Sequence, residues 1–289
     1  MFEVKPNHMI RVQRNQRLAF ISLSLAAAFT VIILLAILFY ILSQGLSVLS
    51  IEFLMEEPRR MGSEGGVFPA IVGTVYLIGM IILIAAPIGV GTAIFLNEYI
   101  NEGPLKKILR FTTELLAAIP SIIFGMFGFI FFVIVLGDYT GGWSLLSGAL
   151  TGVIMILPII IRASEEALRS VPSSLKEGSL ALGTTRWYTI KKVVLPLAIP
   201  GITTSIILAI GRVIGETAAF LLTLGGSLLL ATSIFDGGRT LALHLYLVAM
   251  ETGNYDMAFG AGAVLVILIL IINFAAEALF KLLVRRFSA

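Results

Sequence analysis

Two opposite charges stand close together inside a long apolar stretch of this sequence. Arg212 and Glu216 lie four residues apart between Leu197 and Leu224, so on a helix they share one face about one turn apart. Charged side chains within a membrane-spanning helix are costly and generally face a cavity or a partner. The pair therefore indicates either a station on a substrate path or an ion pair that holds two helices together.

Arginine is well suited to the first of these roles. Its planar fork of donors matches the oxygens of a phosphate-like anion and stays ionised. An unpaired arginine would bind such an anion too tightly, so we expect Glu216 to keep Arg212 from trapping it. Arg162 ends another apolar run and is a candidate for a second, cytoplasm-side station. A basic residue at the membrane interface explains Arg162 equally well.

Other chemistry has little support in the sequence. The chain contains no cysteine and only two histidines, His8 and His244, far apart in the sequence, so thiolate chemistry is excluded. The phosphate-binding pattern G-x-x-x-x-G-K-[ST] is absent, which excludes ATP hydrolysis by a P-loop site. We expect no catalytic residue, no metal site and no cofactor in this chain.

The elements that position these residues are predicted to be membrane-spanning helices. Hydrophobic residues make up 58% of the 289 positions and charged residues only 13%, against roughly 25% charged in an ordinary soluble domain. Six apolar runs have the length that crosses a bilayer. The sequence predicts one all-α transmembrane domain over residues 1–289, a helical bundle with spans at 18–42, 68–96, 108–136, 144–161, 197–224 and 258–284.

The distribution of basic residues indicates the orientation of these spans. Sixteen of the 20 lysines and arginines fall at the two termini, in the 97–107 connection, at Arg110 beside it, or in the 162–196 segment; Lys5 is the first of them. The alternate connections are mostly acidic. Basic residues favour the cytoplasmic side, so we expect both termini in the cytoplasm. The pI of about 9.2 is then a topology signal, and nucleic-acid binding loses its support.

One cytoplasmic connection, 162–196, is much longer than the others. Long connections in compact proteins usually carry function or pack as short helices. The pattern predicts one helix at 175–182 that ends at Gly183, and a second at 187–194 that stops at Pro196. If the two helices lie flat on the membrane at a near right angle to each other, the first helix exposes Glu177, Gly183 and their neighbours to the cytoplasm. An amphipathic hairpin that only anchors the bundle is the alternative.

This segment resembles the EAA loop of ABC-importer permeases, E-A-A-x-x-x-G-x(9)-I-x-L-P. Glu177 and Gly183 match in register, as do Leu195 and Pro196. In that family the loop docks as a coupling helix into a groove of the ATP-hydrolysing subunit and transmits its closure to the spans. The resemblance implies the type I importer permease fold and coupling contacts at Glu177, Gly178, Ser179, Leu182 and Gly183.

Further strings are similar to those of PstA-type phosphate permeases. They are Ile119-Pro-Ser-Ile-Ile-Phe-Gly125, Leu157-Pro-Ile-Ile-Ile-Arg162 followed by Glu165-Glu-Ala-Leu168, and Gly211-Arg-Val-Ile-Gly-Glu-Thr217. The last string also occurs in the PstC-type sister subunit. The resemblance implies a multi-pass permease of the cell inner membrane, with a substrate pathway that includes Arg212, Glu216, Arg162 and Thr217.

The same resemblance implies the partners and the activity. We expect a heterodimer with a PstC-like permease, a PstB-like ATPase dimer that binds ATP and Mg, and a PstS-like phosphate-binding protein. Together these would move inorganic phosphate into the cytoplasm by alternating access. Permeases for sulfate, molybdate or phosphonate and the PstC-type subunit are alternatives. A secondary transporter typically carries internal repeats, which we do not find. A membrane enzyme would need clustered metal ligands, bases or nucleophiles, and the sequence does not supply them.

Overall fold

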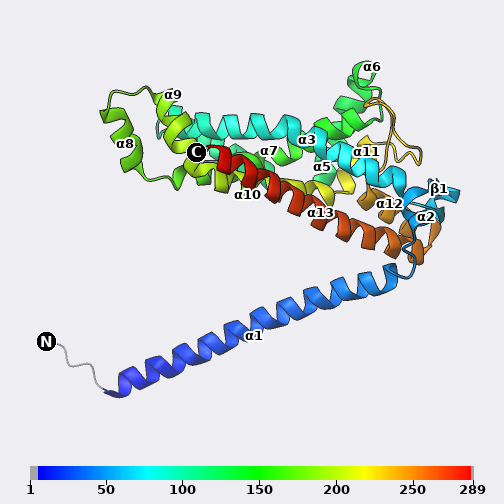
Figure 1. The fold of residues 1–289 in the computed structure, drawn as a ribbon, viewed down its shortest axis with the longest axis horizontal. Helices are drawn as coiled ribbons and strands as arrows, with labels where there is room; N and C mark the ends of the chain where they lie inside the picture. The colour runs from blue at the N-terminus through cyan, green and yellow to red at the C-terminus, as the bar shows by residue number, and fades with distance from the viewer. Residues whose placement is uncertain (1–5, 288–289) are drawn as a thin grey trace.

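The structure is a computed structural model that describes residues 6–287; Lys5, used above for orientation, lies outside the described residues. This part is almost entirely helical (Figure 1). Five helices are long and apolar enough to cross a membrane, and there are six such spans if one bent pair of helices is counted as a single span. The predicted all-α bundle is confirmed. The five long helices are α1 (Pro6–Gly45), α3 (Phe68–Ile94), α7 (Leu145–Arg169), α10 (Leu195–Ile214) and α13 (Tyr255–Phe287).

Helices α3, α7 and α10 form the centre of the bundle. Leu77 and Ile81 of α3 and Ile156 of α7 are fully buried there. A Cβ atom at Gly152 of α7 would lie 2.3 Å from Cδ1 of Ile81. Any larger residue at position 152 would force the side chain of Ile81 to shift, so glycine favours the close approach of α3 and α7, as small residues commonly do between membrane helices.

Helix α1 stands away from the bundle (Figure 1). Every residue from Asn15 to Phe39 is exposed, and the contact with the bundle is at the C-terminal end of the helix. There the ring of Tyr40 meets that of Phe259 on α13 edge to face, with centroids 5.6 Å apart. Along most of its length, the apolar surface of α1 can be covered only by lipid or by another chain.

The third predicted span, 108–136, is wrong as a single straight helix. It consists of α4 (Pro104–Ala118) and α5 (Ser121–Gly128), which continues as the π-helix η3 (Phe129–Val135). The two parts meet at an angle of 96°. Ile119 is extended, with φ −69° and ψ 131°, because the residue before a proline is disfavoured in the helical region. Pro120 thus bends the chain.

The fifth predicted span, 197–224, is also divided. Helix α10 ends at Ile214, and α11 (Ala218–Thr223) begins after a three-residue break. Gly215 occupies the first position of this break, with φ −84° and ψ 1°. The apolar character continues across the break, so hydropathy alone does not reveal it.

The 162–196 segment contains the two predicted helices, with different ends. Helix α7 extends through Arg169, α8 covers Ser173–Ala181, and Gly183 then adopts a φ of +79°. The expected stop at Pro196 is wrong. Helix α9 (Arg186–Thr189) runs through the π-turn η4 (Ile190–Val194) directly into α10. Proline is tolerated there because Pro196 lies in the first turn of α10, where its missing N–H is not needed.

The remaining elements lie mostly at the end of the molecule opposite α8 and α9 (Figure 1). We call the two ends the α8 end and the α12 end. The π-turn η2 (Phe95–Tyr99) instead closes α3 at the α8 end. The others are α2 (Ile51–Met55), β1 (Pro58–Arg59), η1 (Arg60–Gly62), β2 (Glu64–Gly65), α6 (Gly137–Thr140), α12 (Leu241–Leu247) and the π-turn η5 (Val248–Thr252).

Candidate functional site

Arg212 and Glu216 form an ion pair at the point where α10 ends. Nη1 of Arg212 lies 2.5 Å from Oε2 of Glu216. The other oxygen, Oε1, accepts a hydrogen bond of 3.1 Å from the backbone N–H of Ala219 in the first turn of α11. The carboxylate therefore holds the guanidinium and also caps the start of α11. The sequence suggested that the two residues share one continuous helix face. In the structure they pair across a helix break.

The two partners differ strongly in exposure. The side chain of Glu216 is 2% exposed and that of Arg212 is 42% exposed. A Cβ atom at Gly211 would meet nothing within 4 Å, so the surface beside the guanidinium is open. A charge this exposed in an apolar span is strongly disfavoured against lipid. This face must therefore meet water or another protein chain.

The arrangement can bind an oxyanion. Only Nη1 of Arg212 is engaged by a hydrogen bond within the described part of the chain, so Nε and Nη2 remain as a fork for two oxygens. Thr217 follows Glu216 in the same break and is partly buried. The structure thus brings Arg212, Glu216 and Thr217 together at one place.

Arg162 lies at a different place. Its Nη2 is 3.3 Å from Oε1 of Glu114 on α4. Two residues further along α7, Oγ of Ser164 lies 3.1 Å from Oγ of Ser205 on α10, and Arg212 lies about 10 Å beyond Ser205 at the helical rise. The two arginines therefore sit at different depths. Arg162 borders a groove of about 490 Å³ between α4 and α7, whose charged residues are Arg110, Glu114, Arg162, Glu165, Glu166 and Arg169.

Sequence reasoning assigned no site role to Glu165, yet this residue carries the most buried ion pair at the α8 end. Its side chain is 7% exposed, and Oε1 accepts hydrogen bonds from Nε and Nη2 of Arg110, at 2.8 and 2.5 Å. The two residues are 55 positions apart, so helical spacing does not reveal the pair. The sequence did carry one signal that Glu165 forms an ion pair. If the fourth span continues as a helix to Arg169, Glu165 lies on that helix four positions before an arginine.

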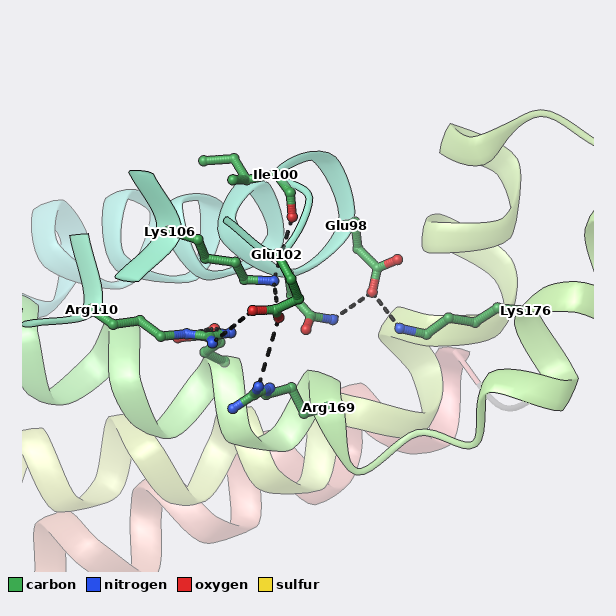
Figure 2. Close-up of polar contacts among 9 residues, drawn as sticks. Glu98, Ile100, Glu102, Lys106, Arg110, Arg169 and Lys176 are labelled. Atoms are coloured by element: carbon green, nitrogen blue, oxygen red, sulfur yellow. Dashed lines mark hydrogen bonds and ion pairs between the residues drawn. The ribbon is translucent and has the colours of Figure 1, made fainter. Parts of the chain in front are cut away.

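A second carboxylate, Glu102, extends this cluster across the surface (Figure 2). Its oxygens lie 2.9 Å from Nζ of Lys106, 3.5 Å from Arg110 and 3.9 Å from Arg169. The hydrogen bond from Lys106 lowers the pKa of the Glu102 carboxyl, and the nearby arginines lower it further. The cluster joins α4 to the end of α7.

Helix α8 presents the predicted coupling residues on an open surface. No residue of α8 is buried, and the side chain of Leu182 is 85% exposed. Glu177 and Gly178 are also exposed. A Cβ atom at Gly183 would meet nothing within 4 Å, so its surroundings are open too. Leu175 and Leu180 are exposed as well, and a group of exposed apolar side chains rimmed by polar residues is typical of an interaction surface.

Ser179 is placed differently from the other predicted coupling residues. Its hydroxyl lies 2.9 Å from that of Thr184 and 2.9 Å from that of Thr189. Thr184 and Thr189 are 3.1 Å apart. This hydroxyl triangle connects α8 to the end of α9, so Ser179 faces the turn within the hairpin.

These features are those of a helical membrane protein with a charged pair in one span and an exposed helical hairpin at one end, and the comparisons with known proteins identify its class. The chain belongs to the family of binding-protein-dependent transport system inner membrane components, whose model matches residues 85–289. Members of this family are non-catalytic membrane subunits of ABC importers, so this chain is a multi-pass membrane protein of that kind.

Individual relatives confirm the resemblance to PstA-type permeases. The chain is 36% identical to the phosphate transport system permease protein PstA 1 of Mycobacterium tuberculosis, over 77% of this chain and 73% of that one. It is 31% identical to PstA of Pasteurella multocida, over 89% and 91%. It is 37% identical to the probable ABC transporter permease protein YqgI of Bacillus subtilis, over 92% and 95%.

Solved structures share the fold. A chain of a bacterial ABC transporter that imports the acidic polysaccharide alginate matches with a TM-score of 0.66 and 17% identity, over 95% of this chain and 98% of that one. A chain of the inward-facing MetNI methionine ABC transporter matches with a TM-score of 0.57 and 21% identity, over 75% and 93%. The ABC-importer permease fold expected from the sequence is therefore confirmed.

Proposed function

We propose that this chain is one of two permease subunits in an ATP-driven importer that moves inorganic phosphate into the cytoplasm by alternating access. The observation that carries the proposal is the half-exposed Arg212, held by the buried Glu216 in an otherwise apolar span. The chain is similar to relatives named as phosphate permeases over most of their length, which supports the same substrate.

The exposed face around Arg212 supports a second permease subunit. Lipid is a poor solvent for this guanidinium, whereas a water-filled path between two permease chains would solvate it and admit the anion. A PstC-like chain is the proposed partner, with Arg212 on the shared path, Thr217 beside it and Arg162 as a station nearer the α8 end.

The α8 end supports the energy input. In the proposed orientation both termini and α8 are cytoplasmic, because the basic residues gather there. A PstB-like ATPase dimer binds ATP and Mg and contacts Glu177, Gly178, Leu182 and Gly183, while Ser179 stiffens the hairpin behind them. A PstS-like binding protein delivers phosphate at the α12 end.

Phosphate uptake into proteoliposomes that contain the complete complex tests the anion site. Arg212→Ala removes a charge-assisted contact of about 1.5–3 kcal/mol, so we expect uptake efficiency to fall about 10- to 100-fold. Arg17→Ala is the matched control, because Arg17 is an exposed arginine on the part of α1 that stands away from the bundle. Unchanged uptake by a normally assembled Arg212→Ala complex would contradict the proposed station.

The same assay tests the substrate and the coupling surface. Excess sulfate or molybdate should leave phosphate uptake nearly unchanged, and equal competition would instead indicate a general oxyanion permease. Gly183→Asp places a charged side chain at a position in the left-handed region of the backbone, on the open face of the hairpin. We expect it to weaken co-purification of the ATPase or to uncouple hydrolysis from uptake, and wild-type behaviour in both would remove this assignment.

A further inference from the structure

One ion pair joins α8 to the end of α3, and the function proposed above does not use it. Nζ of Lys176 on α8 lies 2.6 Å from Oε1 of Glu98, in the π-turn η2 that closes α3. The same oxygen accepts a hydrogen bond of 2.6 Å from Nδ2 of Asn97. Figure 2 shows the side chain of Lys176 extended toward Glu98 across the gap between the two elements.

This pair is shielded from water, unlike most ion pairs on the surface of the chain. The side chains of Glu98 and Lys176 are 13% and 22% exposed. The pair Glu277–Lys281, within one helix, has side chains that are 51% and 70% exposed. Removing one partner of a shielded pair leaves the other charge poorly solvated, so such a contact resists breaking more than a surface pair does.

Helix α8 has few other attachments to the bundle. None of its residues is buried. The hydroxyl of Ser179 ties it to Thr189 of α9, and α9 continues through η4 into α10. The pair with Glu98 ties it to α3. Besides the short backbone connection from α7 through Val171, a movement of α8 therefore has two routes into the bundle, one through α9 into α10 and one through Lys176 into α3.

We propose that the Glu98–Lys176 pair is a positioning contact that carries the displacement of α8 into α3, so that α3 and α10 move together when the ATPase closes. The proposal rests on the proposed function, in which α8 docks on the ATPase. Helix α3 packs along the centre of the bundle through Leu77 and Ile81. A displacement of its α8 end is thus delivered to the tightly packed interface of α3 and α7.

Hydrogen exchange of the complete complex in lipid nanodiscs, with and without a non-hydrolysable ATP analogue, tests this route directly. In the wild type we expect the nucleotide to change exchange both at 95–99 and at 195–199. Lys176→Gln should abolish the change at 95–99 and keep the one at 195–199. Lys107→Gln is the matched control, because Lys107 is an exposed lysine on α4. A nucleotide response at 95–99 that survives in Lys176→Gln would overturn the proposal.

Transport measurements on the same variants separate positioning from folding. For Lys176→Gln we expect normal co-purification and ATP hydrolysis, with phosphate moved per ATP reduced about 3- to 10-fold. Glu98→Gln should have the same effect. Because both substitutions break one contact, Glu98→Gln combined with Lys176→Gln should be no worse than either alone. Multiplying effects in the double variant would contradict a shared role.

The two proposals fail in different ways. If α8 does not dock on the ATPase, exchange at 173–181 will not fall when the ATPase is added, whatever happens at 95–99. If docking is right and the positioning contact is wrong, exchange at 173–181 will fall normally and Lys176→Gln will leave the response of α3 intact.

Discussion

The two charged regions of this molecule are built in opposite ways. In the span, Arg212 and Glu216 come from one short stretch and pair across a helix break. At the α8 end, Arg110 and Glu165 come from positions 55 residues apart. The local pair leaves its arginine half open, whereas the long-range pair has a buried glutamate and an arginine that is only 23% exposed. A binding group must remain accessible, and a connecting group gains by being enclosed.

The same change, glutamate to glutamine, in both regions tests this contrast. The largest effect on stability is expected for Glu165→Gln, because it removes the closer of the two carboxylates that pair with the partly buried guanidinium of Arg110 and leaves only Glu102, at 3.5 Å. Removing one partner of a buried ion pair lowers the free energy of unfolding by about 3–5 kcal/mol. Because the side chain of Arg110 is 23% exposed, we expect a loss near the lower end of this range. Thermal unfolding of the purified complex measures it.

Glu165→Gln should leave the uptake rate per folded complex within about 3-fold of wild type. An equally large fall in uptake with no loss of stability would show that Glu165 belongs to the substrate path. The contrast between the two regions would then be wrong.

Glu216→Gln is expected to act chiefly on turnover. The amide can still cap α11, and the half-exposed Arg212 stays hydrated, so the loss of stability should be about 1–2 kcal/mol. Without the carboxylate, Arg212 should hold phosphate longer, and uptake at saturating phosphate should fall about 10-fold while the apparent KM falls as well. A raised KM with an unchanged maximal rate would contradict the idea that Glu216 promotes release.

The smallest effect concerns Glu102, at the exposed rim of the α8 end. Lys106 and the arginines lower the pKa of the Glu102 carboxyl in the folded protein. The contribution of Glu102 to stability is therefore fully present above its ordinary pKa of 4.5 and is lost as the pH falls through the lowered pKa of the folded state. Glu102→Gln should therefore lower the melting temperature slightly at pH 7 and flatten its decline below about pH 5. An identical pH profile for variant and wild type would show that the cluster contributes nothing at its rim.

The sequence predicted features that depend on local spacing. The helix at α8 and its end at Gly183 followed from a turn signal and a glycine, and the pairing of Arg212 with Glu216 followed from their separation. Hydropathy failed where apolar character continues through a bend. Pro120 in the third span and Gly215 in the fifth both carried the signal for a break, and the long apolar runs around them concealed it.

Contacts between distant segments could not be predicted from spacing. Arg110 and Glu165, and likewise Glu98 and Lys176, meet only because α4, α7, α3 and α8 converge at one end of the bundle. The sequence predicted that basic residues gather on the cytoplasmic side of the spans, and this orientation stays a prediction. The carboxylate that each basic residue meets depends on how the helices pack. Local spacing in a single sequence does not reveal which helices lie side by side.

The outlying position of α1 has a consequence for the order of biogenesis. The ribosome makes α1 before the other described helices, and its contact with the bundle, through Tyr40 against Phe259, is with α13, which is made after them. During synthesis α1 must therefore persist in the bilayer as an independent anchor while the central helices assemble behind it.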